Sequence, residues 1–412
     1  MTDRQVAAHL LVHAGRLLLE YNESSGEIVR TLEKTAEALT EDECHLGIDY
    51  HRVLVSLGEN GPACPTVKEL RYNAAAQMRV HQILDDVRRG DLDAAAALAR
   101  LGQVEAGTPR HPVWLVALLL GGAAASFGHL LGADHTAALV AAVAASLGYL
   151  ARQVLGGRQV SLLALPLVAA LVGAVLGGLA IRLGWTRSPE LVLVVPALMV
   201  VPGPHLINGF LDLLDNHVPM SLFRLGLAGA ILLSAGLGLL LGIELTIPSR
   251  SLTEHPGGAN HLNLVSDMLL AGIATCGFAV FYNVPWRNLW MVASGGIAGH
   301  GIRFLALQAG ARPEAAAFVG GLTVGAVSAW MASRSRSPIA VIGFAGAVTM
   351  IPGLSLFRGL SGARRLALLA DGTTAELAAR TMGHAFQAGL VVGGLGLGLV
   401  IGARVMHALV RE

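Results

Sequence analysis

The feature that most constrains this chain is a series of apolar segments, each long enough to cross a lipid bilayer. The first, residues 113–131, contains no charged side chain, and 19 helical residues extend roughly 28 Å, close to the thickness of the hydrocarbon core. Further segments occur at about 135–155, 161–183, 190–213, 221–247, 263–283, 287–308, 314–333, 338–357 and 383–409. The sequence therefore predicts a mainly α-helical, polytopic membrane protein with about ten transmembrane helices.

The overall composition agrees with a membrane location and excludes several other classes. Hydrophobic residues make up 54% of the 412 residues and charged residues only 14%, whereas soluble proteins carry about 25% charged residues. A net charge of +1 provides no field that would attract nucleic acid. The three cysteines include no CxxC pair, so neither a disulfide framework nor a thiol metal site is expected.

Residues 1–108 have the patterning of a small soluble α/β domain. Two segments with period-two alternation, around 46–50 and 53–57, predict a pair of strands. The expected helices span 6–21, 24–39 with a capping box of Ser24 and Glu27, about 66–89 with a capping box of Thr66 and Glu69, and 91–101. Because the N-terminus lacks an export signal, this domain is expected in the cytoplasm.

The apolar region contains signs of an internal duplication. The tripeptide Arg-Ser-Pro at 187–189 recurs at 336–338, and the Pro-Gly pair at 202–203 recurs at 352–353. The offsets are 149 and 150 residues, which would divide the region into five-span repeats at 112–250 and 262–412. Because five is odd, the second repeat would enter the membrane from the opposite side. Inverted repeats of this kind are typical of secondary transporters, whose substrate sites lie where broken helices meet.

The stretch around the first Pro-Gly pair is the most informative candidate site. Pro202 and Pro204, which flank Gly203, prevent an undisturbed α-helix, and the carbonyl groups this frees at membrane depth must be buried in protein or line a cavity. His205 and Asn208 follow at helical spacing. We expect these five residues to contribute to substrate binding or to the transport pathway.

Two carboxylates, Asp212 and Asp215, continue the same polar stripe. An ionised side chain is costly inside a membrane, so such residues usually face an interior path. We expect one of them to be the proton-coupling group. The alternative is that both lie at the cytoplasmic rim, as a solvated helix end.

The second repeat offers Pro352 and Gly353 as the equivalent break, followed by Arg358. Arg358 would either pair with a substrate carboxylate or anchor the helix end at the membrane interface. No metal site or cofactor is expected: His129 and His135 are six residues apart and would point to different sides of a helix. Asp134 is interpreted as part of a polar helix mouth, with Asn283 as its counterpart in the second repeat.

The domain order and several short motifs resemble the bacterial threonine/serine exporter family. The resemblance rests on residues 15–22, the strand pair at 44–56, residues 202–214 with Arg224, and residues 350–353. It implies export of small hydroxy amino acids driven by the proton gradient, with both termini in the cytoplasm. Related two-subunit systems are associated with dicarboxylate export.

The resulting hypothesis is a secondary transporter of the bacterial inner membrane, not an enzyme, that exports amino acids of the threonine/serine class in a proton-coupled manner. The alternatives are a dicarboxylate (succinate-like) exporter, a membrane-embedded hydrolase and a channel. The expected partners are a small-molecule substrate, protons and the lipid bilayer, without nucleic acid; a homo-oligomer is compatible with the sequence.

Overall fold

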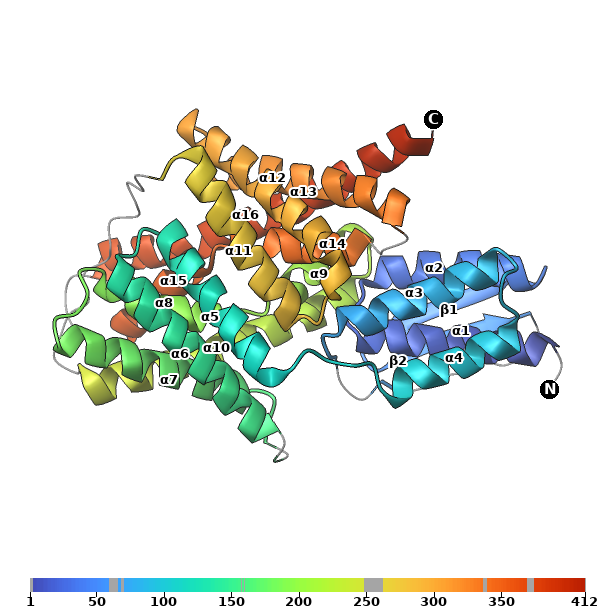
Figure 1. The fold of residues 1–412 in the computed structure, drawn as a ribbon, viewed down its shortest axis with the longest axis horizontal. Coiled ribbons are helices and arrows are strands. Elements are labelled where there is room, and N and C mark those ends of the chain that lie inside the picture. Colours follow the sequence, from blue (N-terminus) through green and yellow to red (C-terminus); the bar gives the residue numbers. More distant parts are fainter. Residues whose placement is uncertain are drawn as a thin grey trace.

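The computed structural model describes residues 3–58, 66–67, 70–156, 158, 160–247, 262–335, 339–368 and 374–411. Figure 1 shows two parts: a smaller N-terminal unit at one end, and a larger bundle formed by the rest of the chain.

In the part that the structure describes, the N-terminal unit comprises four helices and one antiparallel strand pair. Its elements are α1 (Asp3–Glu20), α2 (Ser25–Leu39), β1 (Cys44–Asp49), β2 (Arg52–Leu57), α3 (Ala74–Arg88) and α4 (Ala94–Ala106). The strands pair from Cys44 opposite Leu57 to Asp49 opposite Arg52, and the alternating apolar residues of β2 are buried against α1. The expected strand pair is confirmed, and these two strands are the only ones among the described residues.

Two predicted helix starts in this unit are wrong. Thr66 forms an isolated bridge with Arg52, and α3 begins only after Asn73, whose side chain accepts a hydrogen bond from Ala76 N at 3.2 Å. Likewise α4 is capped by Asp93 rather than starting at residue 91. Ser, Thr, Asn and Asp are comparable N-cap residues, so the local sequence offered several possible helix starts, and tertiary pairing decided among them. Glu69, the second residue of the predicted capping box, lies outside the described residues.

Among the described residues the bundle contains twelve α-helices, six in each half, and four of them form two pairs that are joined at a bend. The first half comprises α5 (Val113–Leu130), α6 (His135–Gly156), α7 (Ala164–Arg182), α8 (Pro189–Leu198), α9 (Gly203–Leu214) and α10 (Val218–Thr246). The second half comprises α11 (Leu264–Phe281), η1 (Trp286–Asn288), α12 (Leu289–Gln308), α13 (Pro313–Ser335), α14 (Ile339–Ala347), η2 (Val348–Met350), α15 (Gly353–Leu368) and α16 (Thr374–Arg411).

Within the described residues, seven helices are long and apolar enough to cross a membrane, and the two bent pairs raise this number to nine. The remaining expected span corresponds to α12, which has 20 residues but includes His300 and Arg303 and does not reach the same mean hydropathy. A count of ten spans therefore stays a prediction.

The two helix breaks fall where the Pro-Gly pairs predicted them. The pair α8–α9 bends by 65° and the pair α14–α15 by 52°, and Pro202 and Pro352 directly precede the second helix of each pair. In both halves the bent pair is the fourth segment in chain order. This order agrees with a duplication of five segments, but an inverted relation between the halves stays a prediction, and residues 336–338 lie outside the described part of the chain.

The two breaks also touch each other. A Cβ atom added to Gly203 would come within 2.8 Å of Ile351 Cδ1, and one added to Gly353 within 2.7 Å of Leu198 Cδ2. The absence of a side chain at Gly203 thus lets the start of α9 approach Ile351 at the second break, and the absence of one at Gly353 lets the start of α15 approach the end of α8. The fold brings together two Pro-Gly pairs that lie 150 residues apart in the sequence.

Candidate transport site

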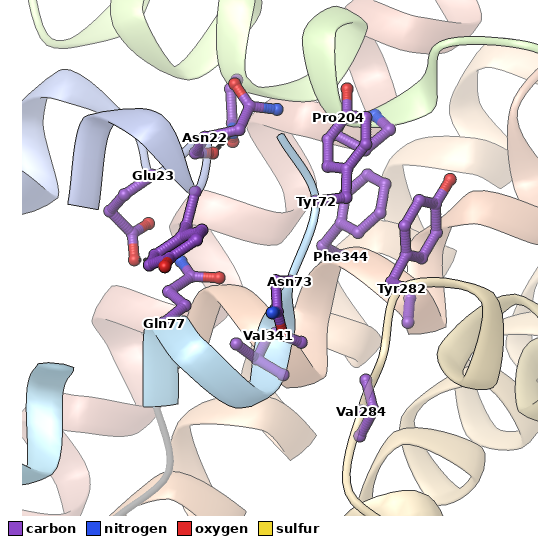
Figure 2. Close-up of a pocket in the computed structure, with 14 residues that line it drawn as sticks. Asn22, Glu23, Tyr72, Asn73, Gln77, Pro204, Tyr282, Val284, Val341 and Phe344 are labelled. Atoms are coloured by element: carbon purple, nitrogen blue, oxygen red, sulfur yellow. Dashed lines mark hydrogen bonds between the residues drawn. The ribbon is translucent and has the colours of Figure 1, made fainter. Parts of the chain in front are cut away.

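A pocket lies beside the start of α9, at the contact between the N-terminal unit and the bundle (Figure 2). Its empty volume is about 450 Å³, including the part open to solvent. It is lined by Tyr21, Asn22, Glu23, Tyr72, Asn73, Ala74, Gln77, Pro204, Asn208, Tyr282, Val284, Val341, Phe344 and Ala345. Both broken pairs contribute to this lining, through α9 and α14, and half of the lining residues come from the N-terminal unit.

The lining combines neutral polar groups with a small apolar wall. Four side-chain amides and three tyrosines supply hydrogen-bonding groups, while α14 supplies apolar side chains. Glu23 is the single carboxylate among the lining residues, and none of them is lysine or arginine. This composition suits a small polar ligand that carries a positive group.

Of the predicted site residues, Pro204 and Asn208 line the pocket, and His205 lies directly beside it in the first turn of α9. The His205 side chain is only 3% exposed, its ring lies 5.4 Å from the Tyr72 ring centre, and its Nδ1 atom has no hydrogen-bond partner among the described residues. A buried polar atom without a partner is uncommon and requires an explanation.

The turn between α1 and α2 attaches the N-terminal unit to α9 and α10. Asn22 adopts a left-handed conformation with φ of 61°, which asparagine tolerates better than most residues. The turn exposes two main-chain carbonyl groups to the bundle. Asn208 Nδ2 donates to the Asn22 carbonyl at 2.6 Å, and Arg224 donates to the Asn22 side chain and to the Glu23 carbonyl.

Asp212 completes this interdomain contact. One of its oxygens accepts a hydrogen bond from Ser25 N, at the start of α2, at 2.7 Å, and the other lies 2.9 Å from Arg224 Nε. Both side chains of the ion pair are fully buried. The interpretation of Asp212 as a solvated helix end is therefore wrong, and its charge instead compensates a buried guanidinium and the positive end of a helix.

Asp215, by contrast, lies at the end of α9, where it forms the C-cap. It pairs with Arg30 of α2 at 3.2 Å and with Arg404 of α16 at 3.0 Å. The Arg30 and Arg404 side chains are 47% and 68% exposed, so each ion pair contributes little individually. Asp215 thus lies at the junction of the N-terminal unit, α9 and the last helix.

No sequence pattern pointed to Glu23 as a site residue. In the structure its carboxylate is buried beside the pocket. It accepts hydrogen bonds from Gln77, from His81 Nε2 at 3.1 Å and from Ser24 N at 3.2 Å. Burial opposes ionisation of Glu23, but the hydrogen bond and charge of His81 outweigh it and lower the pKa of Glu23. Burial likewise disfavours protonated His81, yet the contact with Glu23 raises its pKa.

Arg358 was predicted either to pair with a substrate carboxylate or to anchor a helix end, and it forms a bidentate ion pair with Glu190. Its Nε and Nη2 atoms lie 2.8 and 2.9 Å from the two carboxylate oxygens, and both side chains are largely buried. Glu190 belongs to the first turn of α8, so this pair joins the two halves of the bundle. Figure 1 shows α8 and α15, the two helices that this pair connects, on the side of the bundle away from the N-terminal unit.

Asp134 and Asn283, the predicted polar helix mouths, each lie in a turn between two helices and form several hydrogen bonds there. Asp134 caps α6 through Ala137 N and also accepts hydrogen bonds from Thr186 and Ser188. Burial opposes its ionisation, but these donors lower the pKa of Asp134 to about 2. Asn283 follows α11 and bonds to Asn73 of the N-terminal unit at 2.7 Å.

One geometric expectation about the histidines was wrong. His129 and His135 lie on consecutive helices rather than on one, and their ring centres approach to 5.0 Å because the turn between α5 and α6 reverses the chain. No group of three histidine, cysteine or acidic side chains able to hold a metal occurs in the part of the chain that the structure describes.

The apolar helices, with two pairs that are broken at a bend, define a multi-pass membrane protein. Comparison with protein families identifies the group. Two family models, each described as a threonine/serine exporter, match residues 9–246 and 267–405. The chain therefore belongs to the threonine/serine exporter family, a family of amino-acid export transporters, as the sequence resemblance indicated. No solved structure matches this chain.

Proposed function

We propose that this protein exports small hydroxy amino acids of the threonine/serine class across the bacterial inner membrane, in exchange for protons. The observation that carries the proposal is the meeting of the two Pro-Gly breaks beside the pocket, with α9 starting there. The N-terminus of a half-helix carries a partial positive charge that suits a substrate carboxylate. The apolar residues of α14 would contact the substrate side chain.

The lining favours an amino acid over a dicarboxylate. A dicarboxylate has two negative groups and is usually recognised by basic side chains, but the residues that line this pocket include one carboxylate and neither lysine nor arginine. A zwitterion, with one positive and one negative group, fits this distribution better.

Asp212 is the proton-coupling group in this proposal. Protonation would remove the negative charge that faces Arg224 and the Ser25 N–H group, and would therefore loosen the contact between α9 and the N-terminal unit. Asp215, which contacts both α2 and α16, is the second candidate. Its two ion pairs link the end of α16 to the N-terminal unit, which supports an arrangement with both termini on the cytoplasmic side.

The test is counterflow and pH-gradient-driven transport in proteoliposomes containing the full-length protein. We expect threonine and serine, but not succinate, to exchange, and an imposed proton gradient to drive net threonine movement. Asp212→Asn should abolish the response to the gradient and retain counterflow, whereas Glu105→Gln, in the exposed part of the N-terminal unit, should retain both. Flux without counterflow would indicate a channel, and unchanged gradient-driven transport in both Asp212→Asn and Asp215→Asn would contradict the coupling assignment.

A further inference from the structure

We propose that the N-terminal unit supplies part of the substrate site itself, with the Glu23 carboxylate receiving the ammonium group of the amino acid. This inference rests on the proposed export function and extends it to the recognition of one chemical group. It also assigns a direct role in transport to a unit that lies outside the membrane-spanning helices.

The position of Glu23 in the fold is the first argument. The residue lies in the α1–α2 turn, which is held against the broken helix by Asn208 and Arg224. Figure 2 shows Glu23 and Gln77 on one side of the pocket and Pro204 and Tyr282 on the other. A zwitterion between these sides would direct its ammonium group to Glu23 and its carboxylate to the start of α9.

The hydrogen bonding of Glu23 is the second argument. A carboxylate offers about four acceptor positions, and three donors reach this one: Gln77 and His81 at Oε2, and Ser24 N at Oε1. One position on Oε1 is thus open among the described contacts. Because the side chains of Glu23, Gln77 and His81 are all buried, the carboxylate is held in one orientation before a ligand arrives, which reduces the entropic cost of binding.

Unsatisfied polar atoms around the pocket are the third argument. The Asn22 Nδ2, Tyr72 hydroxyl and His205 Nδ1 atoms are buried without a hydrogen-bond partner among the described residues. All three belong to the pocket lining or its immediate neighbour. Together with Glu23 they supply both donors and acceptors, as the carboxylate, hydroxyl and ammonium groups of a hydroxy amino acid require.

The experiment compares serine with glycerate, in which a hydroxyl group replaces the ammonium group, as competitors of threonine counterflow. The full-length protein is reconstituted as wild type, Glu23→Gln and Glu105→Gln. Glu105 is a matched control because it belongs to the same unit and pairs with Arg16 at 2.6 Å, away from the pocket lining. Reconstituted protein amounts are measured for each variant.

We expect wild type and Glu105→Gln to prefer serine to glycerate by at least about tenfold. In Glu23→Gln the affinity for serine should fall roughly 10- to 100-fold, the usual effect of losing a hydrogen bond to a charged group, while that for glycerate stays unchanged. A general structural defect would weaken both competitors equally. That outcome, or an unchanged preference in Glu23→Gln, would overturn the inference.

The same experiment separates this inference from the proposed function. A wild-type protein that exchanges neither threonine nor serine contradicts the export function itself. A wild-type protein that exchanges threonine but accepts glycerate as well as serine overturns only the role of Glu23, and this comparison requires no variant to fold.

Discussion

Replacing Arg224 with methionine should release the N-terminal unit from α9. Arg224 and Asp212 are both fully buried, with Nε and Oδ2 2.9 Å apart. Arg224→Met would leave the Asp212 carboxylate buried with the Ser25 N–H group as its remaining described partner. Removing one partner of a buried ion pair costs about 3–5 kcal/mol. We expect this cost to destabilise the contact between the N-terminal unit and α9 relative to a state in which the contact is open.

Hydrogen–deuterium exchange at the Ser25 amide measures the opening of this contact directly. A tenfold change in an equilibrium corresponds to about 1.4 kcal/mol. A loss of about 3 kcal/mol should therefore accelerate exchange of the Ser25 amide, followed in a peptide covering residues 20–26, by roughly a hundredfold. Arg404→Met is the matched control, because its pair with Asp215 involves a side chain that is 68% exposed and is worth about 0–1 kcal/mol.

A double variant tests the electrostatic reasoning. In Arg224→Met with Asp212→Leu both buried charges are absent, and replacing an entire buried pair by apolar residues is often nearly neutral. We therefore expect the double variant to recover most of the protection that the single variant loses. Exchange within threefold of wild type in Arg224→Met, or equal losses in the single and double variants, would refute the interpretation.

Three further predictions concern the breaks, the distant ion pair and the buried histidine. Gly203→Val should reduce counterflow at least about tenfold, because even a Cβ atom there meets the opposite break, whereas Gly226→Val, where a Cβ meets nothing within 4 Å, should not. Arg358→Met should lower the free energy of unfolding by about 3–5 kcal/mol. Exchanging the two charges, with Arg358→Glu and Glu190→Arg together, should restore part of this loss. Equal free energies of unfolding for Arg358→Met and wild type would contradict this prediction. His81 has a raised pKa because of its carboxylate partner, so the stability it contributes is complete below its ordinary pKa of 6.5 and is lost as pH rises through the raised value. Unfolding temperatures measured from pH 6 to 9 should therefore fall more steeply for wild type than for His81→Gln.

The local features of this protein were readable from the sequence because their causes are local. The strand pair at 44–57 follows from alternating apolar residues, and the apolar helices follow from the length of uncharged segments. The breaks before α9 and α15 follow from proline, which cannot continue a helix undisturbed. The start of α3 was misplaced because several N-cap residues competed and only tertiary pairing selected Asn73.

Side-chain partners were not predictable in the same way. Helical spacing put His205, Asn208 and Asp212 on one face of α9, but spacing does not identify what that face contacts. The partners of Asp212 and Asn208 in the α1–α2 turn lie 187 and 186 residues away in the sequence. Arg358 was expected either to pair with a substrate carboxylate or to anchor a helix end, and in the structure it pairs with Glu190, 168 residues away in the sequence.

The sequence alone therefore determined that this chain crosses a membrane, where its helices break and to which family it belongs, because hydropathy, proline and short motifs act within a few residues. Only the tertiary structure decided that the two breaks touch, that Asp212 is bound to the N-terminal unit, and that Glu23 faces the pocket. These contacts arise from packing between segments far apart in the chain, and a buried charge acquires its meaning from the groups that surround it rather than from its neighbours in sequence.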